Sequence, residues 1–152
     1  MVTKTLAVVN FAVLSTAEDA VPSPVFYAHD SRPAIYWGSS RSAAHSRYVE
    51  RAGQCGVVIV NTTARSREYR GVYARAAVRL LQDPGEMHKV FALIMARREE
   101  LGGAAYWSWE DFKGGKIGLY EALAGQVWVN MEFTDEHGLV HDRRITVPLP
   151  LT

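Results

Sequence analysis

The chain has 152 residues, of which 48% are hydrophobic and 22% are charged, proportions that are typical of a globular protein with a buried core. Its 17 basic and 16 acidic residues leave a net charge of +1, which argues against electrostatic binding of nucleic acid or of an anionic membrane. A single cysteine, Cys55, excludes an internal disulfide and suits a reducing cytoplasm. We therefore expect one cytoplasmic domain over residues 1–152.

The first segment, residues 1–19, combines a lysine, an apolar run and small residues, which is also the outline of a secretory signal. Asn10 interrupts the run, and acidic residues would follow directly after a cleavage at Ala17. We favour a largely buried strand over residues 5–16. No stretch of the sequence approaches the roughly 18–20 uninterrupted apolar residues of a membrane span.

Two further strands are predicted over residues 21–30 and 34–38. The first of them contains Pro22 and Pro24, which lack the amide hydrogen that a sheet ladder needs. Its first half should therefore lie at a sheet edge or a bulge, where backbone groups are left for another partner.

The middle of the chain alternates helix and strand signals. A short helix is predicted over residues 42–52, with Ser42 as its N-cap and Gly53 just past its end. β-Branched residues predict a strand over 56–63, and a polar connection leads to another strand over 72–81.

The clearest helix begins after Asp83, which supplies a cap and is followed by a proline and, at the third position, by Glu86. Apolar residues then recur at helical spacing until Gly102 and Gly103 end the helix. The residues of this apolar face are Met87, Val90, Phe91, Ile94, Met95 and Leu101.

Residues 104–116 form a connection that is rich in aromatic residues, namely Tyr106, Trp107, Trp109 and Phe112. This segment can pack on its own scaffold, cap a ligand or seal a dimer, and we favour packing because the large apolar area of its rings favours burial. Two strands over 117–133 and 139–149, joined by a turn at 135–138, complete the chain. About seven consecutive strands and two helices indicate a mainly β protein with a closed or partly closed antiparallel barrel.

The segment around residues 39–51 has the composition of an anion site. Helix N-termini expose unpaired amide donors and a partial positive charge, and three serines with Arg41 and His45 would add hydroxyls and charge. A solvated turn with a serine cap is the simpler explanation on local chemistry alone. Arg75 and Arg79 share one face of a strand and could reach a phosphate or a partner chain.

Other motifs are missing from the sequence. The five histidines show no metal-ligand spacing, no serine stands in a nucleophile elbow, and no glycine-rich nucleotide fingerprint occurs. We accordingly expect no metal and name no catalytic residue.

In order and spacing, five segments of the chain resemble the pyridoxamine 5′-phosphate oxidase-like flavoproteins, the FMN-binding split-barrel family. The segments are residues 11–30, 34–50, 56–63, 70–83 and 118–129. The resemblance implies a mainly β, Greek-key-like split barrel with about seven mostly antiparallel strands and two or more flanking helices. It also implies a homodimer with FMN in a groove between the chains.

The resemblance assigns cofactor-binding roles to eleven residues. Ser23, Pro24, Val25 and Phe26 would lay their backbone along the flavin ring. Tyr36 and Trp37 would line the groove. Ser39, Ser40, Arg41, His45 and Arg47 would hold the phosphate. At this helix the family's serine–arginine–lysine run is replaced by Ala43, Ala44 and His45.

The implied activity is a flavin-dependent oxidoreductase that acts on an unknown small molecule. One alternative is a protein of the same fold that uses a deazaflavin or haem in that groove. The other is a dimeric binding protein that has no redox cofactor.

Overall fold

The computed structural model describes residues 5–6, 9, 11–16, 21–61, 71–104 and 106–149. Its strands are β1 (Phe11–Ser15), β2 (Ser23–Phe26), β3 (Ala28–His29), β4 (Ala34–Ser40), β5 (Gln54–Val60), β6 (Gly71–Leu80), β7 (Ile117–Thr134) and β8 (Val140–Val147). Its helices are α2 (Ala44–Ala52), α3 (Pro84–Glu100) and α4 (Trp109–Lys113).

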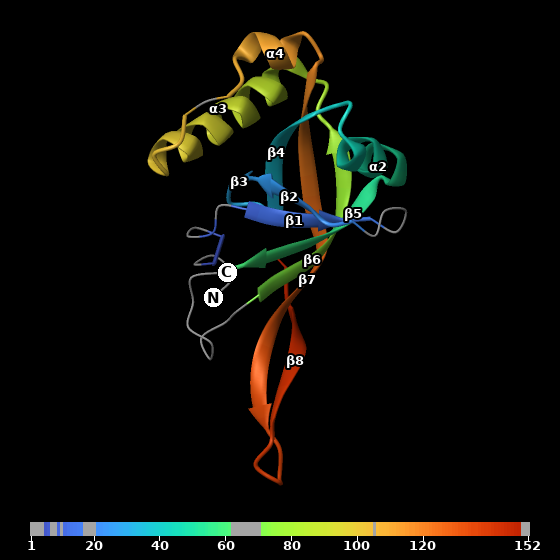
Figure 1. Cartoon of the computed structure of the whole chain (residues 1–152), viewed down its shortest axis with the longest axis vertical. Coiled ribbons are helices and arrows are strands. Elements are labelled where there is room, and N and C mark those ends of the chain that lie inside the picture. The colour runs from blue at the N-terminus through green and yellow to red at the C-terminus, as the bar shows by residue number, and fades with distance from the viewer. Residues whose placement is uncertain are drawn as a thin grey trace.

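All strand pairs form one antiparallel sheet in the order β2-β1-β5-β6-β7-β4-β3, with β8 paired to β7 (Figure 1). The prediction of a mainly β, antiparallel architecture with flanking helices is therefore confirmed. The strand expected over 21–30 is divided at Tyr27 into β2 and β3. β2, which contains Pro24, lies at the sheet edge as the missing amide requires.

Several predicted boundaries were wrong. The strand expected over 5–16 begins only at Phe11, because Thr5 and Leu6 are helical. β5 starts at Gln54, two residues before the predicted strand, and ends at Val60. Residues 62–63 of that prediction lie outside the described part of the chain.

The sheet buries side chains on both faces of β4. One cluster fills the barrel and includes Trp37, whose ring stacks on that of Tyr120 with centroids 5.2 Å apart. The other cluster lies between the sheet and helices α3 and α4 and includes Tyr36. No helix in the described segments is long and apolar enough to cross a membrane.

Three of the four aromatic residues of the segment pack on its own scaffold, as predicted, whereas Tyr106 is 77% exposed. Phe112 of α4 is 2% exposed, and its ring meets that of Phe91 on α3 edge to face at 5.3 Å. Gly38 on β4 allows this approach, since a Cβ atom there would lie 3.0 Å from the Phe112 ring. Trp109 packs edge to face on Phe91 at 5.4 Å.

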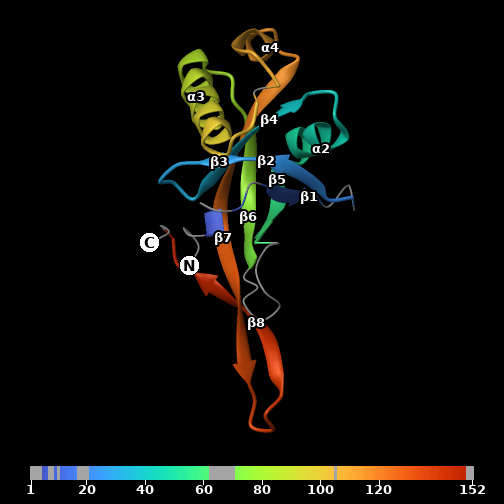
Figure 2. The same cartoon turned by 60° about the vertical axis from the view of Figure 1, so that its left-hand side comes forward.

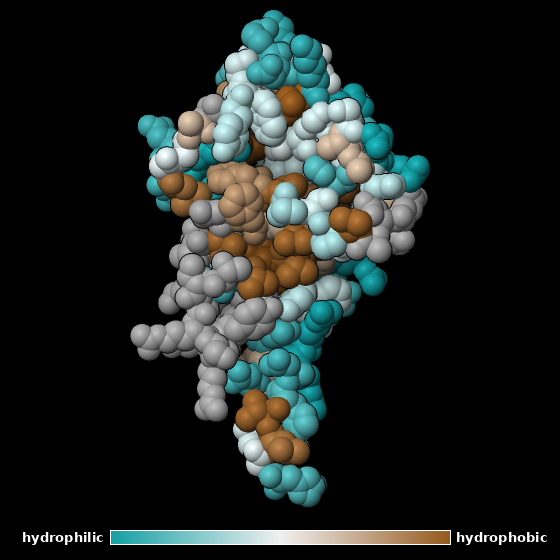
Figure 3. Space-filling model, in the orientation of Figure 1, coloured by the Kyte–Doolittle hydropathy of each residue, from teal (hydrophilic) through white to brown (hydrophobic). Residues whose placement is uncertain are grey.

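The second half of β7 and β8 leave the body as a two-stranded ribbon (Figures 1 and 2). Exposed apolar side chains lie toward its tip, where Figure 3 shows hydrophobic residues. They are Met131, Phe133, Leu139 and Val140. An isolated two-stranded hairpin is marginally stable in water, and exposed apolar side chains are typical of interaction surfaces. The ribbon therefore has the features of a surface that binds another molecule.

Candidate functional site

The turn from β4 into α2 differs from its prediction. The N-cap of α2 is Ala43, not Ser42, and no side chain caps the helix. The hydroxyl of Ser42 instead pairs with that of Ser40, with their oxygens 2.8 Å apart. The helix ends at Gly53 in the left-handed conformation, φ 64°, as the sequence predicted.

The first turn of α2 therefore keeps amide donors that no side chain accepts from. The nine-residue helix also carries no acidic residue in that turn. The positive end of the helix dipole is thus unopposed beside the two serine hydroxyls, Ser40 and Ser42. Chemically, this arrangement fits an anion such as a phosphate.

Ser39 and His45 form a partly buried pair at the same place. The Oγ of Ser39 lies 2.7 Å from Nε2 of His45, and Ser39 is 7% exposed. Burial lowers the pKa of His45, which disfavours the positive charge that an anion would attract. Ser23 of β2 and His45 line the same gap of about 10 Å³ between α2 and the strands, so three predicted site residues converge here.

The two arginines that the resemblance assigns to the phosphate, Arg41 and Arg47, have partners already. Arg41 forms an ion pair with Glu50 at 2.9 Å, and the Glu50 carboxylate also accepts the Tyr120 hydroxyl at 2.6 Å. The hydrogen bonds from Arg41 hold the pKa of Glu50 below its usual range. Arg47 donates to the backbone carbonyl of Ser42. The cations that the sequence assigned to a phosphate are therefore occupied within the chain.

The structure separates the two residues that were expected to line one groove. Tyr36 and Trp37 are consecutive in β4, so their side chains point to opposite faces of the sheet. Trp37 lies in the barrel cluster and Tyr36 in the cluster under α3, and both are 0% exposed. Their side chains therefore face different clusters: Trp37 is enclosed in the barrel, and Tyr36 borders a hollow beside α3.

β2 keeps one edge unpaired among the described strands, since it bonds only to β1. Pro24 is exposed on this edge strand, whereas Val25 is 6% exposed. The ring of Phe26 is covered by the guanidinium of Arg98, 4.5 Å from the ring centroid. The backbone of β2, rather than its side chains, is what this strand offers to a ligand.

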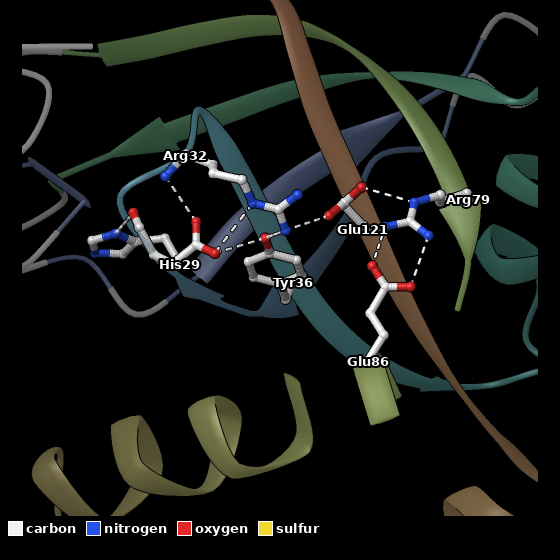
Figure 4. Close-up of polar contacts among 7 residues, drawn as sticks. His29, Arg32, Tyr36, Arg79, Glu86 and Glu121 are labelled. Atoms are coloured by element: carbon white, nitrogen blue, oxygen red, sulfur yellow. Dashed lines mark hydrogen bonds and ion pairs between the residues drawn. The ribbon is translucent and has the colours of Figure 1, made fainter. Parts of the chain in front are cut away.

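A second polar cluster, which the sequence did not indicate, lies across the sheet (Figure 4). Glu121 of β7 is 3% exposed and accepts from Arg32 at 2.7 Å and from Arg79 at 2.9 Å. Arg79 also pairs with Glu86 of α3. Tyr36 donates to Asp30 at 3.0 Å, and burial is the main cause that raises the pKa of its hydroxyl.

This cluster borders an open hollow of about 650 Å³ between the β3–β4 turn and α3. Its three carboxylates, Asp30, Glu86 and Glu121, face two arginines, and Asp83 and Lys89 also line the hollow. Its donors and acceptors face one another in Figure 4, so we interpret the cluster as a brace between β4, β6, β7 and α3. The only sequence signal for this cluster was Glu121 itself, a single glutamate within an apolar run.

The described residues contain no group of three or more His, Cys, Asp or Glu side chains that could hold a metal ion.

Comparison with solved structures shows the fold. A Listeria innocua protein classed with pyridoxamine 5′-phosphate oxidase superposes with a TM-score of 0.62 at 13% identity, over 84% of this chain and 94% of that one. An FAD-binding protein from Mesorhizobium loti superposes with a TM-score of 0.61 at 16% sequence identity, over 84% of this chain and 89% of that one. The haem storage protein HutZ of Vibrio cholerae superposes with a TM-score of 0.61 at 13% sequence identity, over 84% of this chain and 91% of that one.

The chain therefore has the split-barrel fold of the pyridoxamine 5′-phosphate oxidase-like proteins. No protein-family model and no curated protein matches the sequence. Proteins that share this fold include both flavin-binding and haem-binding examples.

Proposed function

We propose that two copies of this cytoplasmic chain bind FMN and act as an oxidoreductase on a small molecule. The observation that carries this proposal is the uncapped first turn of α2. Its amides, the positive end of the helix and the hydroxyls of Ser40 and Ser42 fit a phosphate without any cation.

The residues around this turn define what the chain would do for the cofactor. The flavin would supply the redox chemistry, while the protein binds and orients it and keeps water away. The unpaired edge of β2 offers backbone donors and acceptors to the ring, at a strand whose Ser23 borders the same gap as His45. Arg41 reaches the phosphate only if it first leaves Glu50.

The visible absorption spectrum of the purified protein tests this proposal, followed by titration with FMN. Flavin bands, or a saturable change in flavin fluorescence, support it. A colourless protein that leaves FMN fluorescence unchanged refutes it. A Ser40→Ala, Ser42→Ala variant should bind FMN more weakly than a Ser108→Ala control, which changes a hydroxyl at the start of α4 instead.

Haem is the second candidate, and one observation favours it. Arg41 and Arg47 are engaged within the chain and His45 contacts Ser39, so none of these three described residues offers a free cation at the proposed phosphate site. A protein of the same fold stores haem. A Soret band in the purified protein, or after addition of haem, distinguishes this candidate, and a deazaflavin has a visible spectrum of its own.

A further inference from the structure

The core of the barrel leaves a cavity of about 40 Å³ between β4, β5, β6 and β7. No polar side chain of the described residues lines this cavity, whose walls consist of alanine, valine, isoleucine, leucine and proline. The backbone amide of Ala124, in its wall, donates to the carbonyl of Pro33 at 2.8 Å. A buried water molecule needs about 2–4 polar partners, so this lining favours an apolar occupant over water.

Alanine residues on β6 and β7 create the space. Ala76 stands directly opposite Ala124, and Ala122 stands opposite Val78 on β6 and Ile35 on β4. Ala76 and Ala122 are each only 2% exposed. Alanine is depleted in strands, where β-branched residues pack better, and a cavity in a core lowers stability in proportion to its volume. The chain thus keeps open a space that one larger side chain would fill.

Leu6 forms another part of the cavity wall and is anchored from outside the sheet. Its backbone carbonyl accepts from the guanidinium of Arg97 on α3 at 2.9 Å and from the hydroxyl of Tyr27 at 3.0 Å. Both Leu6 and Arg97 are 8% exposed. These two hydrogen bonds hold the Leu6 wall in place, so the cavity has a defined size.

The alanine pair also marks a route between the cavity and solvent. Ala76 and Ala124 line both the cavity and an open hollow of about 630 Å³ on the other side of the sheet. The register of β6 and β7 shifts between Arg75 and Ala76, and such irregularities interrupt the hydrogen-bond ladder locally. At this point the barrel wall carries only methyl side chains, which leaves a path for a very small molecule.

We propose that the cavity is a binding site for dioxygen. A cavity holds one water molecule from about 10–15 Å³, and an engineered apolar cavity of about 150 Å³ binds benzene. At about 40 Å³ this cavity takes a diatomic gas and excludes an aromatic ring. The choice of dioxygen among small apolar gases rests on the proposed function, because flavin and haem, the two candidate cofactors, both carry out dioxygen chemistry.

Methyl relaxation under gas pressure tests this site. Dioxygen is paramagnetic and speeds the nuclear relaxation of the groups that it contacts, whereas nitrogen at the same pressure does not. In the full chain with ¹³C-labelled alanine methyl groups, Ala76 and Ala122 should show an enhancement at least about twofold larger than Ala28. Ala28 is the matched control, since it is 0% exposed but lies in the cluster under α3, away from the cavity.

Substitutions that change the cavity volume sharpen the test. Ala122→Val fills the cavity and should abolish the excess relaxation at Ala76. Ala76→Val should abolish it at Ala122 and serves as a second variant if the first does not fold. Leu6→Ala enlarges the cavity and should increase the excess at both alanines. Ala92→Val, at an exposed position of α3, is the control and should leave the excess unchanged. Circular dichroism identifies the folded variants.

Three results would overturn the inference: equal enhancement at Ala76, Ala122 and Ala28, an excess that every folded valine variant at the cavity retains, or nuclear Overhauser contacts that show water inside the cavity. The measurement needs no cofactor. A dioxygen signal in a protein that does not bind FMN or haem would therefore support the gas site while refuting the proposed function. Cofactor binding without a dioxygen signal would do the reverse.

Discussion

The Oγ of Ser39 and the Nε2 of His45 lie 2.7 Å apart and join the end of β4 to the first turn of α2. Burial lowers the pKa of His45, so this contact makes His45 a structural neighbour of the proposed phosphate site rather than a source of positive charge. The pair also makes the stability of the fold depend on pH.

We predict that the folded protein loses stability as the pH falls below about 6.5, partly through His45. Burial lowers the folded pKa of His45 below the unfolded value, so the unfolded state takes up the proton first and is favoured on acidification. Urea unfolding at pH 7.5, 6.5 and 5.5 measures this dependence. His45→Gln should flatten the slope. An unchanged slope would show that His45 titrates alike in both states.

Glu121 should contribute strongly to stability. Removing one partner of a buried ion pair costs about 3–5 kcal/mol, and because Arg32 and Arg79 are half exposed we expect about 2 kcal/mol for Glu121→Gln. Glu110→Gln is the matched control, since Glu110 pairs with Lys113 at 3.8 Å on an exposed surface. Equal unfolding free energies for the two variants would contradict the brace.

At lower pH, the protonation of Glu86 should further reduce the stability of the folded protein. Hydrogen bonds from Arg79 lower its folded pKa, so its stabilising contribution is complete above the unfolded value of about 4.3 and is lost as the pH falls further. Unfolding free energies at pH 5.5, 4.5 and 3.5 should decline less steeply in Glu86→Gln than in the wild type. If the unfolding free energies of both proteins declined in parallel, Glu86 would not be a cause of the acid sensitivity.

Glu50 should limit the affinity for FMN. It holds Arg41 at 2.9 Å, and Glu50→Gln releases that guanidinium toward the start of α2. One added charge-assisted hydrogen bond to phosphate should strengthen binding about tenfold in a fluorescence titration. Glu99→Gln, on the exposed side of α3, should bind as the wild type does. Equal affinities would mean that Arg41 does not reach the phosphate.

Local signals predicted much of this fold. Asp83 caps α3 by accepting from the Glu86 amide at 2.8 Å, and Gly53 ends α2, because caps and left-handed turns depend on residues close in sequence. Pro24 likewise indicated an edge strand. In each case the deciding interaction, or the missing donor, lies within a few residues.

The parts that the sequence did not reveal depend on distant contacts. Glu121 joins Arg32 and Arg79 over 89 and 42 residues of chain, so no local pattern indicates the brace. The pairing of Ala76 with Ala124 becomes visible only when the register of β6 and β7 is known. Ser42 was a reasonable cap, but its hydroxyl bonds to Ser40 instead and leaves the helix start open.

The aromatic segment before β7 should matter for stability and not for the cofactor. Phe112 is 2% exposed against Phe91 and Trp107, so Phe112→Ala should cost about 3–5 kcal/mol of unfolding free energy. Tyr106 is 77% exposed, and Tyr106→Ala should cost less than about 1 kcal/mol even though its ring lies beside Arg98. Phe112→Leu, which keeps most of the volume, should fold well enough for a cofactor titration. If the Phe112→Leu variant folded fully but bound the cofactor more weakly than the wild type, the segment would contact the ligand and would not serve the scaffold alone.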